Sequence, residues 1–389
     1  MQILTVHNRY LIRGGEDESR EAEARLLQAK GHQVDVYEEN NDRVAALGKL
    51  RVALRTTWSG ESYQNLKRQL KTSPYDLVHV QNFFPLISPS VHYAAQDLGV
   101  PVVQSLRNYR LICANSAFFR DGKVCEDCLG KFIPWPGVVH GCYRGSRVGT
   151  VAVTSMITVH RVMKTWERMV DLYIALTHFS RQKLIQGGFP ADKIVVKPNF
   201  VYPDPGVGAG SGNYALFVGR LSPEKGIETL LQAWQLLGQP LSLKIVGEGP
   251  ISDTVTRAAA SSDQIEWLGR RPLAEVYDLI GEAKLLIFPS EWYETFGRVA
   301  VEAFAKGTPV IAANIGAIAE LVDHNHTGRL FQPGNPEDLA GHIDWALSHP
   351  QELTQMRHSA RAEFEAKYTA EENYRQLMAI YQRVIDNRK

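Results

Sequence analysis

Short, nearly continuous apolar runs alternate with amphipathic segments along the first half of the chain. The segment after the first run carries Ala22, Leu26 and Leu27 on one face, which is the spacing of a helix packed on a core. Strands with few polar residues are typical of a parallel sheet covered by helices on both faces. The runs that we predict to be strands are Ile3–Val6, Val34–Tyr37, Leu77–Val80, Val100–Gln104, Tyr173–Ala175 and Ile194–Val196.

A segment rich in proline and glycine, Pro203–Gly212, interrupts this alternation and is predicted to be a linker. Its spaced glycines precede a strand, whereas a dinucleotide-binding fingerprint follows a strand and opens a helix. The alternation then resumes, which predicts a second parallel α/β domain. The strands predicted there are Tyr214–Val218, Leu243–Val246, Ile265–Leu268, Leu285–Phe288, Pro309–Ala312 and Gly328–Phe331.

We therefore predict two doubly wound domains. The first covers 1–202, the linker 203–212 and the second domain 213–368, and a helix within 369–389 packs back on the first domain. Ligands of such sheets bind outside the carboxyl ends of the strands, so we expect the site in a cleft between two facing domains.

The composition narrows the class of protein. The 389 residues include 43 Lys and Arg against 42 Asp and Glu, a balance that argues against a general nucleic-acid binder. The longest uncharged apolar-leaning run, 148–159, is too short to span a bilayer. The amino terminus lacks the basic region of a signal peptide. These features favour a soluble, cytoplasmic protein.

Two glutamates follow the predicted strand Leu285–Phe288. Glu294 lies near the start of a helix, where backbone N–H groups favour anions. Glu302 lies within an otherwise apolar helix, where a carboxylate needs hydrogen bonds that a ribose diol would supply. The alternative is that both are caps or surface residues, and the apolar neighbours Val301 and Phe304 make this the weaker reading for Glu302.

A second polar loop follows the strand Tyr214–Val218. It contains Gly219-Arg220 and Lys225-Gly226, in which glycine permits close approach to the backbone and the two cations suit a diphosphate. A solvated strand–helix turn is an equally good interpretation of this loop by itself.

Together, these stretches resemble those of the retaining glycosyltransferases of family GT4, which have the GT-B fold. The resemblance covers nearly the whole chain, and the combination of motifs is specific although each piece is weak. The residues that carry it are Gly14-Gly15, Gly219-Arg220, Lys225-Gly226, Val246-Gly247-Glu248-Gly249, Glu294, Phe296-Gly297, Glu302, Gly307-Thr308-Pro309, Gly316 and Glu320.

The resemblance implies an α/β protein of two Rossmann-like domains that uses a nucleoside-diphosphate sugar. Arg220 and Lys225 would hold the diphosphate, and Glu294 would bond hydroxyls of the donor sugar; these three would be the catalytic residues. Glu302 would bond the ribose. The complete set of donor-binding residues that it implies is Gly14, Gly15, Gly219, Gly247, Phe296, Gly297, Arg298 and Glu302.

No two aspartates stand two residues apart, so the chain lacks an Asp-x-Asp metal clamp. The charge of the leaving group would then be neutralised by Arg220, Lys225 and helix N-termini, without a catalytic metal. No positioned nucleophile is evident, which favours front-face attack over double displacement.

One position departs from the family pattern. Many relatives carry a histidine after the strand Val100–Gln104, where this chain has Arg107 followed by Asn108. Arginine is always charged and cannot act as a base. Either Arg107 binds a negatively charged sugar or phosphate, or transfer is altered or lost. His79 and His7 are candidates for the missing role, although strand-end histidines are more often structural.

The four cysteines, Cys113, Cys125, Cys128 and Cys142, all lie within an insertion at 113–142. Four thiolates satisfy tetrahedral Zn²⁺, so we expect a structural zinc on the acceptor side rather than a catalytic metal. Buried thiols, disulfides and an iron–sulfur cluster remain alternatives.

The segment 100–168 holds ten Lys and Arg against four Asp and Glu, with aromatic residues interleaved. A peripheral membrane contact fits this pattern, as does docking on a lipid-linked or phosphorylated acceptor. An ordinary helix packed in the first domain fits it equally well.

The sequence thus predicts a retaining, metal-independent hexosyltransferase that acts on a glycan or lipid-linked acceptor. The alternatives are another GT-B enzyme, such as an epimerase or phosphorylase, and a catalytically silent protein that binds sugar nucleotides. No lysine that would hold the pyridoxal phosphate of a phosphorylase is identifiable.

Overall fold

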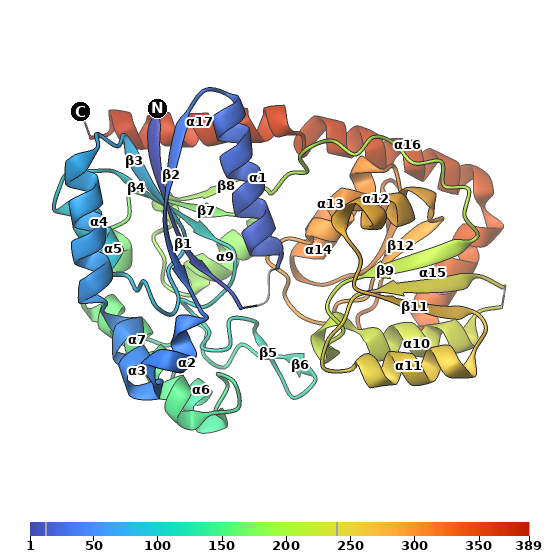
Figure 1. Ribbon diagram of the computed structural model, residues 1–389. Coiled ribbons are helices and arrows are strands. Elements are labelled where there is room, and N and C mark those ends of the chain that lie inside the picture. Colours follow the sequence, from blue (N-terminus) through green and yellow to red (C-terminus); the bar gives the residue numbers. More distant parts are fainter. Residues whose placement is uncertain (12–13, 239, 389) are drawn as a thin grey trace. The chain divides into compact units, whose positions relative to one another are not determined.

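The computed structural model describes residues 1–11, 14–238 and 240–388, which form two compact units. The first unit comprises 1–118, 125–198 and 373–389, and the second comprises 119–124 and 199–372. The second unit thus runs from 199 to 372 rather than from 213 to 368, and it includes the segments 203–212 and 119–124, which the sequence predicts to be a linker and part of the first domain. Figure 1 labels the elements of both units.

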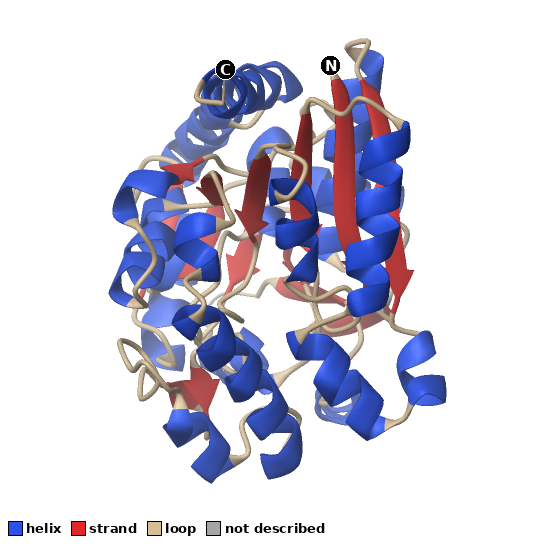
Figure 2. Cartoon of the chain, turned by 90° about the vertical axis from the view of Figure 1, so that its left-hand side faces the viewer, coloured by secondary structure: helices blue, strands red, loops and turns tan. Residues whose placement is uncertain are grey.

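The first unit is built on a six-stranded parallel sheet of order β2-β1-β3-β4-β7-β8. Helices cover the sheet, as Figure 2 shows for the side of the molecule that carries this unit. The strands are β1 (Gln2–Arg9), β2 (Gln33–Asn40), β3 (Leu77–Asn82), β4 (Val102–Leu106), β7 (Leu172–Ala175) and β8 (Ile194–Val196). The helices are α1 (Gly15–Ala29), α2 (Arg43–Leu47), α3 (Lys49–Thr57), α4 (Gly60–Thr72), α5 (Ser90–Gln96), α6 (Trp135–His140), α7 (Arg147–Val162), α8 (Thr165–Arg168), α9 (His178–Gln186) and α17 (Ala370–Asp386).

The last helix, α17, contributes to the core of the first unit. Its residues Leu377, Ile380, Tyr381 and Val384 are spaced so that they form one helical stripe, and all four are buried in a cluster with β1, β3, β4 and β7. An amphipathic helix far along the chain thereby completes the cover of the first sheet.

The second unit repeats the architecture with the strand order β11-β10-β9-β12-β13-β14, again parallel throughout. Its strands are β9 (Tyr214–Val218), β10 (Ser242–Val246), β11 (Ile265–Gly269), β12 (Leu285–Phe288), β13 (Val310–Ala313) and β14 (Gly328–Phe331). Its helices are α10 (Ile227–Leu236), α11 (Ser252–Ser261), α12 (Leu273–Glu282), α13 (Arg298–Ala305), α14 (Gly316–Leu321), α15 (Pro336–Ser348) and α16 (Pro350–Lys367), and a short hairpin joins β5 (Phe119–Arg120) to β6 (Lys123–Val124).

All twelve predicted strands are present, although β4 begins at Val102 rather than at residue 100. Two Rossmann-like parallel sheets confirm the predicted fold class, the GT-B fold. The glycine-rich segment differs from a free linker, because its backbone is hydrogen-bonded within the second unit. The N–H groups of Gly208, Gly210 and Gly212 donate to the carbonyl groups of Lys306, Gly281 and Glu282 at 2.8–2.9 Å.

Candidate functional site

In the second sheet, the order of the strands reverses between β9 and β12. Ligands of doubly wound sheets bind outside the carboxyl ends of the strands at such a reversal. The two loops that leave these strands are 219–226 and 289–297, and they carry the candidate residues Arg220, Lys225 and Glu294. The topology therefore brings the two motifs of the sequence to one edge of the sheet (Figure 1).

Glycines allow the loop after β9 to lie in backbone contact with the loop after β12 and with the loop after β10, which contains Gly247. A Cβ on Gly247 would lie 1.8 Å from the carbonyl oxygen of Gly219, and one on Gly226 would lie 1.9 Å from that of Pro289. Both glycines have positive φ angles, of 135° and 68°. The N–H of Gly219 also donates to the carbonyl of Val246 at 3.0 Å. Only glycine fits at these two positions, so the close packing of these loops depends on the two glycines.

Glu294 is the centre of a polar cluster. Its Oε1 accepts hydrogen bonds from Lys225 Nζ at 2.5 Å, Trp292 Nε1 at 2.8 Å and Ser290 Oγ at 3.0 Å. The residue is only 9% exposed. A carboxylate that is held by a cation and two neutral donors is fixed in orientation, as a group that must recognise a sugar hydroxyl needs to be.

Two cations belong to the loop after β9. Lys225 lies near the rings of Trp292 and Phe288, with Nζ 5.3 and 6.0 Å from the ring centroids. Arg220 is exposed at the start of the same loop. A paired lysine and an accessible arginine on one loop can neutralise an anionic group that approaches this edge.

Glu302 lies one turn after Arg298 on α13. Arg298 Nε donates to Glu302 Oε1 at 2.8 Å, and Glu302 is 4% exposed. This buried carboxylate is thus hydrogen-bonded, and a donor is the arginine of its own helix. Gly297, with φ of 121°, precedes the helix, while the ring of Phe296 is buried against Tyr368. Phe296 can therefore offer a ligand only its backbone.

In the first unit, Arg107 and Asn108 follow β4 at the carboxyl edge of the sheet. Arg107 is 8% exposed, and its Nε donates to Gln81 Oε1 at 3.0 Å. Asn108 Nδ2 donates to Glu16 Oε1 at 3.0 Å, in the first turn of α1. Gly14 and Gly15 are exposed at the start of that helix. The structure thus brings two of the predicted segments, Gly14-Gly15 and Arg107-Asn108, to one edge of this sheet.

A buried charged cluster lies behind Arg107. Glu23 Oε2 is 3.4 Å from Lys197 Nζ, and both residues are almost completely buried. Burial alone would raise the pKa of Glu23, but the charges of Lys197, His79 and Arg107 together with a hydrogen bond from Gln81 lower it to about 2. Glu23 therefore stays ionised and balances part of the surrounding positive charge.

His79 is placed inside this cluster rather than at the sheet edge. Its ring nitrogens contact Tyr381 Oη at 2.7 Å and Ser105 Oγ at 2.9 Å, and burial lowers its pKa to about 4. Because both nitrogens are engaged within the core, His79 is unsuited to the predicted contact with a sugar. The other candidate, His7, bonds Asp17 through Nε2 at 2.8 Å and is equally buried.

None of the four cysteines forms a disulfide bond. Burial, together with the nearby thiols of Cys113, Cys142 and Cys125, raises the pKa of the Cys128 thiol to about 11. The other three sulfurs therefore lie within electrostatic range of Cys128, and four thiolates suit zinc. Nevertheless, no group of three or more His, Cys, Asp or Glu side chains among the described residues is arranged to hold a metal ion.

Sequence reasoning missed several residues of these sites. Ser290 and Trp292, which bond Glu294, gave no signal because neither belongs to a spacing pattern that indicates a site. Glu23 could have been found, since it shares an apolar helical face with Leu26 and Leu27 at the i, i+3, i+4 spacing. Lys197, directly after β8, had no such pattern.

Two family models match the chain. The model described as "Glycosyl transferase 4-like domain" matches residues 14–199, and the model "Glycosyl transferases group 1" matches residues 207–363. The matches cover the two predicted domains separately and include every candidate residue except His7; the carboxyl-terminal helix also lies outside them.

The curated relatives match over part of their length. An uncharacterised glycosyltransferase of Methanocaldococcus jannaschii is 31% identical over 179 residues, which are 46% of this chain and 50% of the relative. D-inositol 3-phosphate glycosyltransferase of Rhodococcus erythropolis is 32% identical over 187 residues, which are 42% and 41% of the two chains. The chain thus spans about half the length, or less, of the relatives that it matches.

Among solved structures, HepE of Anabaena in complex with UDP has a TM-score of 0.69 to this chain. The similarity covers 98% of this chain and 100% of HepE, at 19% sequence identity. At that identity the comparison establishes the fold.

Proposed function

Since this chain belongs to the GT4-like glycosyltransferases, we propose that it transfers a hexose from a nucleoside-diphosphate sugar to a glycan or lipid-linked acceptor, with retention of configuration. The observation that carries the proposal is the Lys225–Glu294 pair at the strand-order reversal of the second sheet. This edge combines an oriented carboxylate with cations, which are the groups that a sugar and its diphosphate require.

Each residue has a role that its surroundings support. Lys225 and Arg220 neutralise the diphosphate as the glycosidic bond breaks, and Glu294 bonds hydroxyls of the donor sugar. Glu302 bonds the ribose, with Arg298 holding its carboxylate in place at 2.8 Å. The backbone at Phe296-Gly297 and the glycines Gly219 and Gly247 line the approach of the nucleotide.

The first unit contributes Gly14 and Gly15 at the start of α1, where backbone N–H groups suit an anion. An anion at Gly14 would replace the carboxylate of Asp17, whose Oδ2 accepts from the Gly14 N–H at 3.1 Å. Arg107 and Asn108 contact the acceptor or the donor sugar. Transfer proceeds by front-face attack, in which the acceptor oxygen forms the new bond on the side from which the nucleoside diphosphate departs. Lys225 and Arg220 stabilise the charge on that leaving group, so this scheme requires no catalytic metal.

A panel of UDP-, GDP-, ADP- and dTDP-sugars tests the proposal. UDP is bound in the HepE structure, which makes the UDP-sugars the first donors to test. We expect one nucleotide to raise the melting temperature, because a ligand that binds only the native state stabilises it, and its sugar to be transferred or hydrolysed. Binding without transfer or hydrolysis would instead identify a silent sugar-nucleotide binder, in line with the arginine at position 107.

We also propose that Cys113, Cys125, Cys128 and Cys142 hold a structural zinc. The support is that all four thiols gather around Cys128 and that none is in a disulfide. Metal analysis of the purified protein is expected to find about one zinc per chain. Removing it with a chelator should lower the melting temperature, and Cys125→Ala should lower the zinc content. Zinc-free protein whose melting temperature is unaffected by zinc would rule the site out.

A further inference from the structure

The first unit has an outer surface of unusual composition, formed by α3, α6, α7 and the loops beside them. Seventeen large hydrophobic side chains are exposed among the described residues, and twelve of them lie here. We call these twelve the apolar surface: Leu50, Leu54, Trp58, Phe132, Ile133, Trp135, Val139, Val148, Val151, Val159, Val162 and Met163.

The elements of the apolar surface are adjacent. Both α3 and α6 pack against α7, and these helices lie together in Figure 1. Arg147 Nε donates to the carbonyl of Val139 at 3.2 Å, which joins α6 to the start of α7. Arg161 bonds the carbonyl of Phe132, and His160 Nε2 contacts the carbonyl of Thr57 at 2.9 Å. These contacts join the loop before α6 and the end of α3 to the last turn of α7, so the surface is continuous.

Helix α7 is apolar on both sides. Its inner face buries Val153, Met156, Ile157 and other residues in the first unit. Its outer face carries exposed valines at 148, 151, 159 and 162, a stripe that is interrupted only by Ser155. Isolated exposed apolar residues are ordinary, but a stripe that is continued by two neighbouring helices indicates an interaction site.

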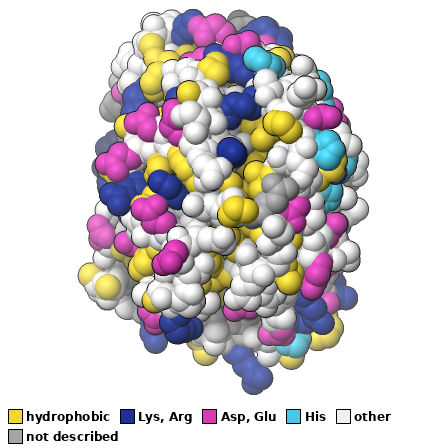
Figure 3. All heavy atoms as spheres, turned by 90° about the vertical axis from the view of Figure 1, so that its right-hand side faces the viewer, with side chains coloured by type: hydrophobic (Ala, Val, Ile, Leu, Met, Phe, Trp, Pro, Cys, Tyr) yellow, Lys and Arg dark blue, Asp and Glu magenta, His cyan; other side chains and the backbone are white. Residues whose placement is uncertain are grey.

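The charge of this surface is of one sign. Segments 43–59 and 128–166, which supply all twelve apolar residues, contain nine Lys and Arg and no Asp or Glu. The whole chain has 43 basic and 42 acidic residues, so an acid-free stretch of this composition is unusual. By contrast, acidic and basic side chains are interspersed on the face that Figure 3 shows. Six of the nine cations have exposed side chains: Lys49, Arg51, Lys131, Arg144, Arg147 and Lys164.

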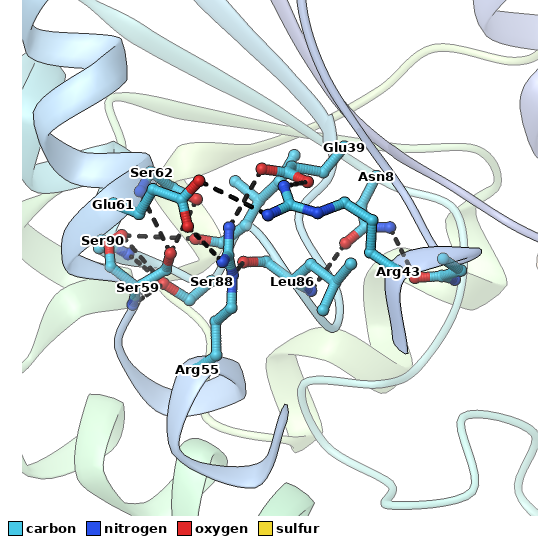
Figure 4. A network of polar contacts seen from close by, with 12 residues as sticks. Asn8, Glu39, Arg43, Arg55, Ser59, Glu61, Ser62, Leu86, Ser88 and Ser90 are labelled. Atoms are coloured by element: carbon cyan, nitrogen blue, oxygen red, sulfur yellow. Dashed lines mark hydrogen bonds and ion pairs between the residues drawn. The ribbon is translucent and has the colours of Figure 1, made fainter. Parts of the chain in front are cut away.

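Helix α3 is anchored from its inner side, independently of its exposed leucines. Arg55 bonds Glu39, Glu61 and the carbonyl of Leu86 at 2.6–3.0 Å, in the network that Figure 4 shows. Leu50 and Leu54 are 75% and 66% exposed, so they add little to the core of the first unit and are accessible to a partner.

We propose that the apolar surface docks this protein on an anionic lipid bilayer. Tryptophan, phenylalanine and valine side chains can enter the boundary between headgroups and acyl chains, while the surrounding lysines and arginines attract anionic headgroups. Contact of this kind requires no spanning segment, and among the described residues no helix is both long and apolar enough to cross a bilayer.

The charge distribution favours a bilayer over two other partners. A second copy in an isologous dimer would bring the same basic surface against itself, with no carboxylate within the two segments to pair the cations. A nucleic acid would be attracted by the cations, but it offers nothing to a stripe of valines. An anionic bilayer offers negative headgroups to the cations and an apolar interior to the hydrophobic side chains.

The surface adjoins a pocket at the carboxyl edge of the first sheet. This pocket, of about 180 Å³, takes Val44 from α2, Val52 from α3 and the pair Tyr143 and Arg144 that precede α7. The guanidinium of Arg110, which also lines it, lies 4.6 Å from the Phe84 ring centroid. This last step alone rests on the proposed transferase function. If that function holds, this pocket binds the acceptor, the docked protein presents it to the headgroups of the bilayer, and the acceptor is lipid-linked.

Co-sedimentation with vesicles tests the docking. We expect the full chain to bind vesicles that contain phosphatidylglycerol and not vesicles of phosphatidylcholine alone. Salt should weaken the binding, because the Debye length falls from about 10 Å at 0.1 M to about 3 Å at 1 M. Val148→Glu combined with Val162→Glu should lower the affinity for anionic vesicles by at least about tenfold, through repulsion and lost insertion.

Leu236→Glu combined with Leu273→Glu is the matched control, since both leucines are exposed in the second unit. This variant should bind vesicles as the unaltered protein does, and the melting temperature of both variants should stay near that of the unaltered protein. The proposal would be overturned if the Val148 and Val162 variant bound anionic vesicles as well as the unaltered protein does, or if the unaltered protein did not bind them. It would also be overturned if the unaltered protein formed a dimer and this variant were a monomer.

The vesicle assay is independent of catalysis. Loss of the proposed function would appear as absent turnover with vesicle binding intact. Failure of the docking proposal would appear as turnover on a soluble acceptor without vesicle binding. The two outcomes are therefore distinguishable in one preparation of protein.

Discussion

At the scale of single residues, the first unit carries an ionised glutamate in its core. Glu23 is bordered by Lys197 at 3.4 Å, by His79 and by Gln81, and Gln81 in turn accepts a hydrogen bond from Arg107. Burying charges is costly unless they are paired and hydrogen-bonded. The cluster links the core to Arg107, so it positions the residue that stands where many relatives of this family have histidine.

Ionisation of Glu23 should make the free energy of unfolding depend on pH. Its pKa is lowered from 4.5 to about 2, so the stabilisation is present above about pH 4.5 and is lost as pH falls towards 2. The shift corresponds to about 3 kcal/mol. Denaturant titrations from neutral to acidic pH should show this loss, and in Glu23→Gln that component should be absent.

Glu23→Gln also leaves Lys197 without its carboxylate, which should cost about 3–5 kcal/mol at neutral pH. If the single variant does not fold, the double variant Glu23→Gln with Lys197→Met removes both charges and permits the measurement. An unchanged slope of stability between pH 4.5 and 3 in either variant would show that Glu23 is not the group responsible.

At the scale of elements, periodicity was enough to predict all twelve strands and the last helix. Buried parallel strands are nearly all apolar, and α17 repeats its apolar residues at helical spacing, so both signals are local. The role of the segment 203–212 was not predictable, because its contacts join backbone groups to Gly281, Glu282 and Lys306 far along the chain. Glycine composition indicates conformational freedom but does not reveal which partner a backbone meets.

The candidate site residues were likewise predictable from the sequence where the signal is local, but their contacts with one another were not. The sequence placed Glu294 and Lys225 on separate loops, and the strand order brings them to 2.5 Å. The cysteine spacing indicated a cluster, whereas the described residues form no completed metal-binding group. The contacts of His79 were not predictable, because its partner Tyr381 comes from a helix some three hundred residues away in the chain.

The glycine contacts between loops give a prediction at this scale. Gly247→Ala would place a Cβ 1.8 Å from the Gly219 carbonyl at a φ of 135°, so the loops must separate. We expect a loss of at least about 3 kcal/mol in the free energy of unfolding. In Gly341→Ala, whose new Cβ meets nothing within 4 Å inside α15, stability should rise by about 0.5–1 kcal/mol. Equal stability of the two variants would contradict the assigned contact.

At the scale of the whole molecule, two units of similar architecture carry different chemistry. The second unit has a carboxylate–cation edge suited to a nucleotide sugar, and the first has a pocket beside a basic, apolar surface. The carboxylate–cation edge and the pocket each lie at the carboxyl ends of the strands of their own sheet, which is where doubly wound sheets bind ligands. A near-neutral chain thus contains strongly one-signed regions, which composition alone does not reveal.

The central claim is that Glu294 recognises the donor sugar during transfer. The most direct measurement compares sugar transfer by the unaltered protein, by Glu294→Gln and by Glu266→Gln, with the donor that gives the largest thermal shift. Glu266 is a suitable control because it is an exposed glutamate of the same unit. We predict that Glu294→Gln lowers turnover by at least about 10²-fold at an unchanged melting temperature, while Glu266→Gln retains full activity. Turnover by Glu294→Gln at the level of the unaltered protein would contradict the account.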